Sequence, residues 1–356
     1  MTIEDITLPT IFCPFPSAVN PHREAVHEHT LEWVGHHRLV TDARAFERLR
    51  AAQFGQLVAR AYPNAPLDRL RLLSDWITWL FILDDECDEH GIGKRPERLA
   101  ALQARCLKVL VGSRPEEPDP QGLTYPVSDL RAAGKVRPDV PLLGALRDIR
   151  KRLRACMPHA WMMRFALGVS DYFEACEWEA RNRVQRVWPD PAVYIQMRPY
   201  TGALYLLLDL IEMTEGTVLP LTVRKHPLLR ALMRITSNVV CWSNDIFSLE
   251  KERAHHDLHN LVLILQRHDG LNLQEAVNRV AILTDKQVRR FIELEALLPR
   301  FGGPLDADVR RFIGVLRSWM RGNLDWSYES GRYRPTDASA PVGVPEPRAA
   351  GSGVNQ

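Results

Sequence analysis

Apolar residues recur at three- and four-residue spacing along most of the chain, which is the period of an amphipathic α-helix. The segment 96–111 is typical, because Leu99, Leu102, Cys106 and Leu110 share one of its faces. The alternation and turn signals expected of strands and hairpins do not appear. The pattern therefore predicts an all-α fold. The predicted helical segments are 31–46, 54–61, 67–83, 96–111, 142–153, 157–178, 191–211, 227–253, 273–298 and 306–328.

Proline and glycine interrupt this pattern in three places. Pro199 lies inside the segment 191–211 and should kink or break that helix. The stretch 112–126 is rich in Pro and Gly, and we expect a surface loop there because the helical pattern resumes on both sides. Residues 335–356 are rich in Pro, Gly, Ala and Ser, a composition that predicts disorder. We therefore expect one helical domain over 1–334, followed by a disordered tail.

Chain length and cysteine usage narrow the class of protein. The 356 residues can bury a large core, as one domain or as two. The longest apolar run, 203–211, is broken by Asp209 and falls short of the roughly 18 to 20 residues that span a bilayer. The first residues lack a signal-peptide pattern, and the six cysteines form no CxxC pair. These features predict a cytoplasmic protein without a membrane span.

The charge balance indicates no nucleic-acid partner. The 46 basic and 44 acidic residues give a net charge of +2. The basic stretch 131–154 lacks the interleaved aromatic residues that stack on bases. His255, His256 and His259 resemble a metal cluster, but adjacent histidines point to different sides of a helix. No other Cys or His lies at zinc-like spacing from these histidines, so we expect no zinc site.

Two oxygen-rich patterns carry the candidate chemistry. Asp84 and Asp88 end a long apolar helix and share one face, being four residues apart. Asn244, Ser248 and Glu252 repeat this four-residue spacing and form a second stripe. Two stripes of hard oxygen ligands that face each other predict a cluster of Mg²⁺ ions, and Mg²⁺ in proteins is usually held together with substrate phosphates.

These motifs, in this order, resemble those of a microbial, and in particular bacterial, class I terpene synthase. Asp84, Asp85 and Asp88 fill the family's aspartate-rich motif, and the Asn-Asp-x-x-Ser-x-x-x-Glu motif begins at Asn244 without departure. The resemblance covers about residues 15–333. It implies a single-domain helical bundle around a central apolar cavity, with the two metal stripes on opposite walls of its mouth. The metal ligands it implies are Asp84, Asp85, Asp88, Asn244, Ser248 and Glu252.

The same resemblance implies three Mg²⁺ ions, for which Mn²⁺ is an alternative, and an isoprenoid diphosphate as partner. Arg198 lies 46 positions before Asn244, where the family has its diphosphate-sensing arginine. Lys251, Arg332 and Tyr333 match its other diphosphate-binding positions. Whether the chain forms a homodimer is left open by the sequence.

Thr201 and Gly202 match the linker and effector positions that follow the family's sensing arginine. The family linker is often Asp, so Thr201 is a variant. A helix break near Gly202 leaves a carbonyl oxygen unpaired, and such a dipole at the cavity wall stabilises a carbocation.

Aromatic residues are the candidates for the cavity wall. Leu80, Phe81 and Trp326 match contour positions of the family, and aromatic faces stabilise cations. Trp76, Trp79 and Trp242 fit either the cavity or the core, and residues 239–242 should point partly inward. Asp85 and Glu86 lie off the face shared by Asp84 and Asp88, so we expect them to tolerate substitution better.

The expected reaction is metal-dependent ionisation of farnesyl diphosphate and cyclisation to a sesquiterpene, with release of pyrophosphate. A diterpene cyclase acting on geranylgeranyl diphosphate is the alternative. A prenyl diphosphate synthase is less favoured because it needs a second aspartate-rich motif, and Asn244, Ser248 and Glu252 stand in its place. A helical binding scaffold without catalysis would not need both metal stripes.

Overall fold

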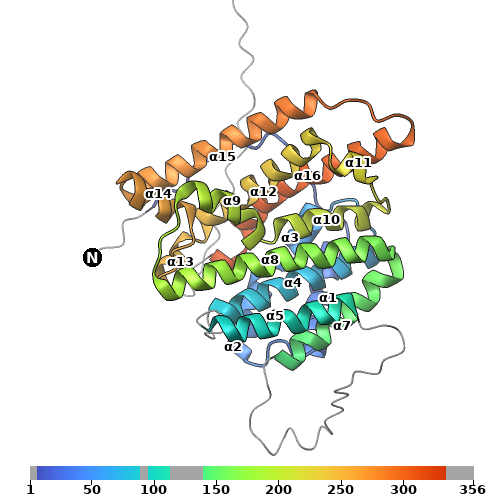
Figure 1. Cartoon of the computed structure of the whole chain (residues 1–356), viewed down its shortest axis with the longest axis horizontal. Coiled ribbons are helices and arrows are strands. Elements are labelled where there is room, and N and C mark those ends of the chain that lie inside the picture. Colours follow the sequence, from blue (N-terminus) through green and yellow to red (C-terminus); the bar gives the residue numbers. More distant parts are fainter. Residues whose placement is uncertain (1–5, 89–94, 113–138, 334–356) are drawn as a thin grey trace, which may run out of the picture.

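The computed structural model describes residues 6–88, 95–112 and 139–333, and within them it contains helices and no strand (Figure 1). The all-α prediction is confirmed. The helices are α1 (Arg23–His36), α2 (Ala43–Ala52), α3 (Phe54–Ala61), α4 (Leu67–Asp88), α5 (Pro96–Val111), α7 (Asp139–Cys156), α8 (His159–Gln185), α9 (Pro191–Thr201), α10 (Leu204–Glu215), α11 (Leu221–Arg224), α12 (Pro227–Phe247), α13 (Leu249–Ala254), α14 (Leu261–Asp269), α15 (Leu273–Ala296), α16 (Pro304–Glu329) and the 3₁₀ turn η1 (Gly331–Tyr333).

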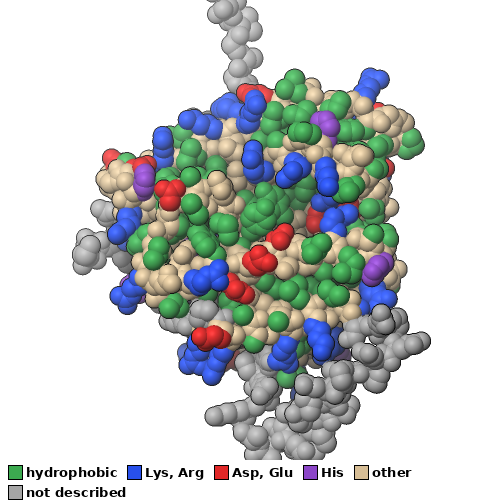
Figure 2. All heavy atoms as spheres, in the orientation of Figure 1, with side chains coloured by type: hydrophobic (Ala, Val, Ile, Leu, Met, Phe, Trp, Pro, Cys, Tyr) green, Lys and Arg blue, Asp and Glu red, His purple; other side chains and the backbone are tan. Residues whose placement is uncertain are grey.

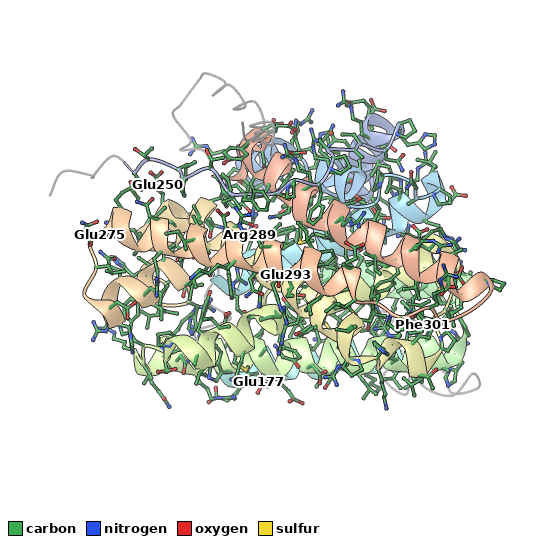
Figure 3. The ribbon with its side chains drawn as sticks, turned by 90° about the horizontal axis from the view of Figure 1, so that it is seen from above. Glu177, Glu250, Glu275, Arg289, Glu293 and Phe301 are labelled. Atoms are coloured by element: carbon green, nitrogen blue, oxygen red, sulfur yellow. The ribbon has the colours of Figure 1, made fainter. Side chains whose placement is uncertain are left out.

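The long helices pack side by side around one hydrophobic core. In Figure 1, α15 covers the top of the molecule, α8 crosses its front, and α5 and α7 form its lower edge. Helix α12 lies inside and packs against both α15 and α16. Figure 3, seen from above, shows α15 running across the molecule from Glu275 past Arg289 and Glu293. The core cluster includes buried residues from Ile11 to Trp326, so segments near both ends of the described chain share it.

The surface carries mixed charge. Figure 2 shows basic side chains spread over the face rather than gathered in one patch. Hydrophobic side chains gather in a hollow near the middle of this face, between α15 above and α8 below. None of the helices in the described segments is long and apolar enough to cross a membrane.

Local sequence signals place several helix starts. Asp42, Asp190 and Asn272 accept hydrogen bonds from backbone N–H groups at the starts of α2, α9 and α15. Asn272 and Glu275 form a reciprocal capping box, which satisfies two backbone donors that the helix itself cannot pair. These three caps are exposed. Asn260 caps α14 in the same way, but its side chain is fully buried.

The segment 227–253, predicted as one helix, consists of α12 and α13, which meet at Ser248. This correction leaves the metal stripe in register. The Ser248 N–H donates to the Asn244 carbonyl at 2.8 Å, and the Glu252 N–H donates to the Ser248 carbonyl at 2.9 Å. The four-residue hydrogen-bond pattern therefore passes through the junction, and the three stripe residues stay on one side.

The break expected at Pro199 lies slightly later. Helix α9 includes Pro199 and ends at Thr201, and α10 begins at Leu204. Between them Ala203 adopts φ +55°, a left-handed conformation that ends a right-handed helix. Of the loop predicted at 112–126, all but Gly112 lies outside the described residues, as does the tail 335–356. The domain bounds of 1–334 stay a prediction.

We expect Gly322→Ala to destabilise the fold, because α16 crosses α3 in direct backbone contact there. A Cβ at Gly322 would lie 2.8 Å from the Arg60 carbonyl carbon and 2.9 Å from its oxygen. Overpacking of this kind costs about 1 to 3 kcal/mol. Gly314→Ala on the same helix is the control, since a Cβ there meets nothing within 4 Å and alanine favours helix by about 1 kcal/mol. In a thermal unfolding experiment, Gly322→Ala should have a lower Tm than the parent protein, and Gly314→Ala should not. Equal Tm values for the two variants would contradict the close contact between α16 and α3.

Candidate active site

A cavity of about 1380 Å³ lies between the helices and gathers residues from both ends of the chain. Its lining has two parts. The apolar part includes Leu57, Ile77, Leu80, Phe81, Leu204, Leu207, Val240, Trp319 and Trp326. The polar part includes Asp84, Arg198, Asn244, Ser248, Lys251, Glu252, Arg332 and Tyr333. Asp84 of the first predicted stripe and all three residues of the second therefore border the same cavity, and each of these eight polar residues was a sequence-based candidate.

The aspartate motif at the end of α4 contacts the second motif directly. Asp85 accepts hydrogen bonds from Lys251 Nζ at 3.1 Å and from Arg332 Nη2 at 3.2 Å. Burial raises the pKa of Asp84, and the neighbouring Asp85 raises it further. Burial also acts on Asp85, but Arg332 and Lys251 outweigh it and hold the pKa of Asp85 below its ordinary value. The side chain of Asp88 lies outside the described residues.

Asp84 lines the cavity and Asp85 does not, which agrees with the expectation that Asp85 lies off the face of Asp84, but Asp85 has functional partners of its own. Asp85 joins α4 to α13 and to η1 through Lys251 and Arg332. Helical spacing alone put Asp84 and Asp88 on one face, but two cations approach Asp85 from other parts of the chain. A carboxylate that pairs with two cations holds the mouth of the cavity together, so Asp85 should be sensitive to substitution.

The second motif presents an amide, a hydroxyl and a carboxylate. Asn244 Oδ1 accepts from Arg198 Nη2 at 2.9 Å, and Asn244 Nδ2 donates to the Tyr333 hydroxyl at 2.7 Å. Ser248 Oγ donates to the Asn244 carbonyl oxygen at 2.8 Å, which leaves its lone pairs as acceptors. Arg198 and Tyr333, both predicted to bind diphosphate, thus contact a predicted metal ligand.

Glu252 supplies the charge of this stripe. Its Oε2 accepts from Asn260 Nδ2 at 2.7 Å. Burial raises the pKa of Glu252 well above its ordinary value, and the nearby Asp245 and Asp257 raise it further. Ionised Glu252 therefore lacks a full countercharge within the described residues. A hard divalent cation fits this donor set, because it would neutralise the carboxylate and accept the oxygens of Asn244 and Ser248.

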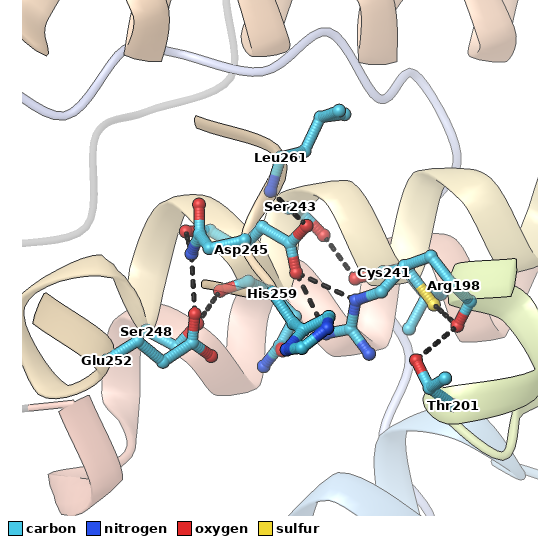
Figure 4. Close-up of polar contacts among 12 residues, drawn as sticks. Arg198, Thr201, Cys241, Ser243, Asp245, Ser248, Glu252, His259 and Leu261 are labelled. Carbon is cyan, nitrogen blue, oxygen red and sulfur yellow. Dashed lines mark hydrogen bonds and ion pairs between the residues drawn. The ribbon is translucent and has the colours of Figure 1, made fainter. Parts of the chain in front are cut away.

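Arg198 is oriented by Asp245, the second residue of the motif (Figure 4). Arg198 Nε donates to Asp245 Oδ1 at 2.9 Å, and the Tyr194 hydroxyl and the Leu261 N–H donate to Oδ2 at 2.9 Å each. Burial opposes the charge on Arg198, but Asp245 keeps the pKa of Arg198 well above its ordinary value. Asp245 therefore ties α9, α12 and α14 together and holds a permanent cation at the cavity wall.

Comparison with known proteins shows which family has a site of this kind. Residues 75–290 match the family model described as terpene synthase family 2, C-terminal metal binding. The chain belongs to the terpene synthase family. Its relatives include a (+)-T-muurolol synthase from Roseiflexus castenholzii, described as cyclising (2E,6E)-farnesyl diphosphate. That protein is 37% identical over 326 residues, which cover 92% of this chain and 94% of the relative.

Another relative and two solved structures also match this chain over most of its length. Germacrene A synthase from Nostoc punctiforme is 34% identical over 331 residues, covering 93% of this chain and 96% of the relative. Among solved structures, wild-type cucumene synthase superposes with a TM-score of 0.70 at 29% identity, covering 88% of this chain and 98% of that one. The SVS_A2 protein from ancestral sequence reconstruction gives 0.77 at 27% identity, covering 94% and 93%. The resemblance read from the motifs is confirmed, and the fold is that of a class I terpene synthase.

In this terpene synthase the helix break after Arg198 borders the cavity. The Arg198 carbonyl oxygen accepts from the Gly202 N–H at 2.9 Å and from Thr201 Oγ1 at 3.4 Å. A Cβ on Gly202 would lie 2.8 Å from Cys241 Sγ and 3.0 Å from Arg198 Nη1. A side chain at this position would therefore displace the Cys241 thiol or the Arg198 guanidinium. Thr201 contacts the backbone carbonyl of Arg198 rather than its guanidinium.

The aromatic wall forms around Phe81. Its ring stacks on Phe54 with centroids 4.2 Å apart and lies 6.3 Å from Trp326. The Arg332 guanidinium lies 4.5 Å from the Phe81 centroid. Trp326 faces the cavity while its Nε1–H donates to the Ala52 carbonyl at 2.9 Å. Leu80, Phe81 and Trp326 thus lie where the sequence placed them, and Phe81 links the apolar wall to a diphosphate-binding candidate.

The tryptophans left open by the sequence belong to the core. Trp76 stacks on Trp79 with centroids 5.4 Å apart, and Trp79 Nε1 donates to the Leu142 carbonyl. Neither they nor Trp242 line the cavity. Of residues 239–242, only Val240 and Cys241 line it, so the expected inward position of Val239 and Trp242 is wrong. Successive residues of a helix point about 100° apart, so four consecutive residues cannot all face one wall.

Several residues in or beside the cavity wall are not among the candidates that the sequence predicts. Trp319 lines the cavity seven positions before Trp326, so the period of α16 could have placed both on one face. Asn260 stands directly before an apolar run, which is a capping signal. Tyr172 from α8 and Arg48 from α2 also line the cavity, but no local motif marks them.

Proposed function

We propose that this terpene synthase is a Mg²⁺-dependent sesquiterpene cyclase that ionises farnesyl diphosphate and releases pyrophosphate. The observation that carries the proposal is the convergence of Asp85, Lys251 and Arg332, within 3.1 to 3.2 Å, at the polar end of an apolar cavity. Relatives described as cyclising farnesyl diphosphate support the C15 substrate.

The test is incubation of the purified protein with C10, C15, C20 and C25 isoprenoid diphosphates and Mg²⁺. Gas chromatography–mass spectrometry should show a cyclic C15 hydrocarbon or alcohol from the C15 substrate. A C20 product as the main one would favour the diterpene cyclase. A longer diphosphate formed when isopentenyl diphosphate is added would favour the prenyl diphosphate synthase. No turnover of any substrate would favour the binding scaffold.

The metal ligands of this proposal are Asn244, Ser248 and Glu252 on one wall, with the predicted Asp84, Asp85 and Asp88 on the other. Within the described residues Asp84 and Glu252 both line the cavity, and Lys251 reaches across to Asp85 at 3.1 Å. Three Mg²⁺ ions, with Mn²⁺ as an alternative, are the proposed set. Such ions, when bound, neutralise charge that develops on the leaving diphosphate.

The side chains of Arg198, Lys251, Arg332 and Tyr333 complete the diphosphate site. The first three supply guanidinium and ammonium donors, and burial raises the pKa of Tyr333 to about 12, so its hydroxyl stays a donor at neutral pH. Donors already fixed near the developing charge stabilise the transition state without reorganisation. In the proposed complex the diphosphate takes over donors that now bind Asp85, Asn244 and Asp245.

The apolar walls act after ionisation. Leu57, Leu204 and Val240 are buried and line the cavity, so the carbocation is held away from water. The faces of Phe81 and Trp326 stabilise it through their quadrupoles. The effector role proposed for Thr201 and Gly202 rests on the helix break beside Arg198, where no described donor bonds the Gly202 carbonyl oxygen. Cytoplasmic localisation and a homodimer stay predictions.

Substitution of the cavity aromatics should change product identity more than the rate of ionisation. Phe81→Leu and Trp326→Phe leave the polar residues in place, so pyrophosphate release should continue. Each removes or weakens an aromatic face worth about 1 to 2 kcal/mol to a desolvated cation, enough to redirect a branch about tenfold. Acyclic or early-deprotonated hydrocarbons should increase.

The matched control for the aromatic variants is Trp76→Phe, because Trp76 is buried on the same helix as Phe81 but does not line the cavity. Its product profile should match that of the parent protein. Unchanged profiles in Phe81→Leu and Trp326→Phe would show that these residues do not guide the cation.

A further inference from the structure

Asn260 links the two helices that flank the end of the metal stripe, and it uses every polar atom of its side chain. The side chain is 0% exposed, between α13 and α14. Its Nδ2 donates to Glu252 Oε2 at 2.7 Å and to the Asp245 carbonyl oxygen at 2.6 Å. Its Oδ1 accepts from the Val262 N–H at 2.8 Å. One amide therefore connects a proposed metal ligand to two separate backbone segments.

The orientation of this amide is determined by its surroundings. Oδ1 faces the first backbone N–H groups of α14, which can only donate, so Nδ2 must point the other way. The two Nδ2 hydrogens then meet two acceptors, Glu252 Oε2 and the Asp245 carbonyl oxygen. An exchange of the amide nitrogen and oxygen would place an oxygen against both acceptors. The donor to Glu252 is therefore fixed by the start of α14.

Helix capping alone does not explain this residue. Asp42, Asp190 and Asn272 cap other helices while exposed to solvent, and an aspartate serves as well as an asparagine there. At position 260 an aspartate would cap α14 but would place a second carboxylate against Glu252. Position 260 therefore requires a side chain that accepts hydrogen bonds from α14 and donates one to Glu252, and an amide does both.

Glu252 needs such a donor because the nearby charges of Asp245 and Asp257 oppose its ionisation more strongly than Arg198 favours it. The contact of Glu252 with Asn260 is made through Oε2. A donor that occupies Oε2 sets the plane of the carboxylate and leaves Oε1 for a cation bound in the cavity that Glu252 lines. Partners of this kind orient metal ligands and tune their affinity.

The loop that carries Asn260 is itself held against α8 and α9. Asp257 accepts from Arg183 Nη2 at 2.9 Å, and the His259 N–H donates to Asp257 at 3.0 Å. The His259 ring packs edge-on to Trp178, with centroids 5.4 Å apart. The Tyr194 hydroxyl lies 3.0 Å from the His259 carbonyl oxygen. Asn260 therefore stands on a loop that is anchored on both sides.

We propose that Asn260 is a positioning residue that holds the Glu252 carboxylate in the orientation required to bind the divalent metal. The proposal rests on the function proposed above, in which Glu252 is a metal ligand. Asn260 acts through Glu252 and touches neither metal nor substrate.

The test compares Asn260→Ser and Asn260→Asp with Asn272→Ser. All three keep a side chain that can cap a helix, but only the first two remove the donor to Glu252. Asn260→Asp also preserves the size and shape of the side chain, so an effect shared by both variants does not come from a cavity. Circular dichroism checks the fold of each. Mn²⁺ affinity is measured from the electron paramagnetic resonance signal of free Mn²⁺, with inorganic pyrophosphate present, and the Mg²⁺ dependence of turnover is recorded in parallel.

Both Asn260 variants should bind Mn²⁺ about 10- to 100-fold more weakly and need correspondingly more Mg²⁺, the usual effect of losing a partner of a metal ligand. Their kcat should recover in part at high Mg²⁺, and Asn272→Ser should match the parent protein. Parental Mn²⁺ affinity in both Asn260 variants, with weakened binding in Glu252→Ala, would overturn this inference and leave the proposed function standing. Parental affinity in Glu252→Ala would overturn the metal assignment and this inference with it.

Discussion

Glu252→Ala is expected to lower the turnover of farnesyl diphosphate by about 10³-fold or more. The variant loses the only carboxylate of the stripe formed by Asn244, Ser248 and Glu252, and with it the charge that would hold a divalent cation at this wall. A bound metal contributes several kcal/mol to stabilising a leaving group, and 10³-fold corresponds to about 4 kcal/mol. Steady-state release of pyrophosphate at saturating Mg²⁺ measures the effect.

The fold should survive this substitution. Because burial and neighbouring acids raise the pKa of Glu252, the charge of this carboxylate contributes no stability to the fold. Its removal costs mainly the hydrogen bond from Asn260, and far-UV circular dichroism should stay native. Glu250→Ala is the control, since Glu250 is exposed two positions earlier and should keep full activity. Parental turnover in Glu252→Ala would contradict the metal assignment.

Arg332→Met should lower kcat by about 10²- to 10³-fold, the usual cost of one donor to developing charge in a closed site. Arg332 borders the cavity, donates to Asp85 at 3.2 Å and lies 4.5 Å from the Phe81 centroid. Methionine keeps the length and apolar contact of the side chain but removes the guanidinium. Single-turnover assays separate this loss from any change in product release.

Two truncations of the C-terminus provide the control for Arg332→Met. Removing residues 336–356 should leave kcat unchanged, because this segment is too poor in apolar residues to repay the entropy of ordering it. Removing residues from 330 onward also deletes Arg332 and Tyr333 and should abolish turnover. Equal activity in the two truncations, or parental kcat in Arg332→Met, would exclude the diphosphate-binding role of this pair.

Much of the fold could be predicted because helical period and end signals are local. The segment 96–111 was predicted with the bounds that α5 has, and the end of 67–83 lies inside α4. The short helices α11 and α14 were missed, since four to nine residues hold too few apolar positions to show a period. The candidate residues of the stripes could be named for the same reason, because ligands on one helix are set by spacing alone.

The spacing of residues along the chain does not predict which helices contact each other. The sequence by itself determined that the chain is helical, that two oxygen-rich stripes exist, and which family their order resembles. Only the tertiary structure decided that Asp85 meets Lys251 and Arg332, and that Trp76 packs in the core while Trp319 reaches the cavity. The reason is that a helical period records which residues share a face, whereas the partner of that face is chosen by packing between segments hundreds of residues apart.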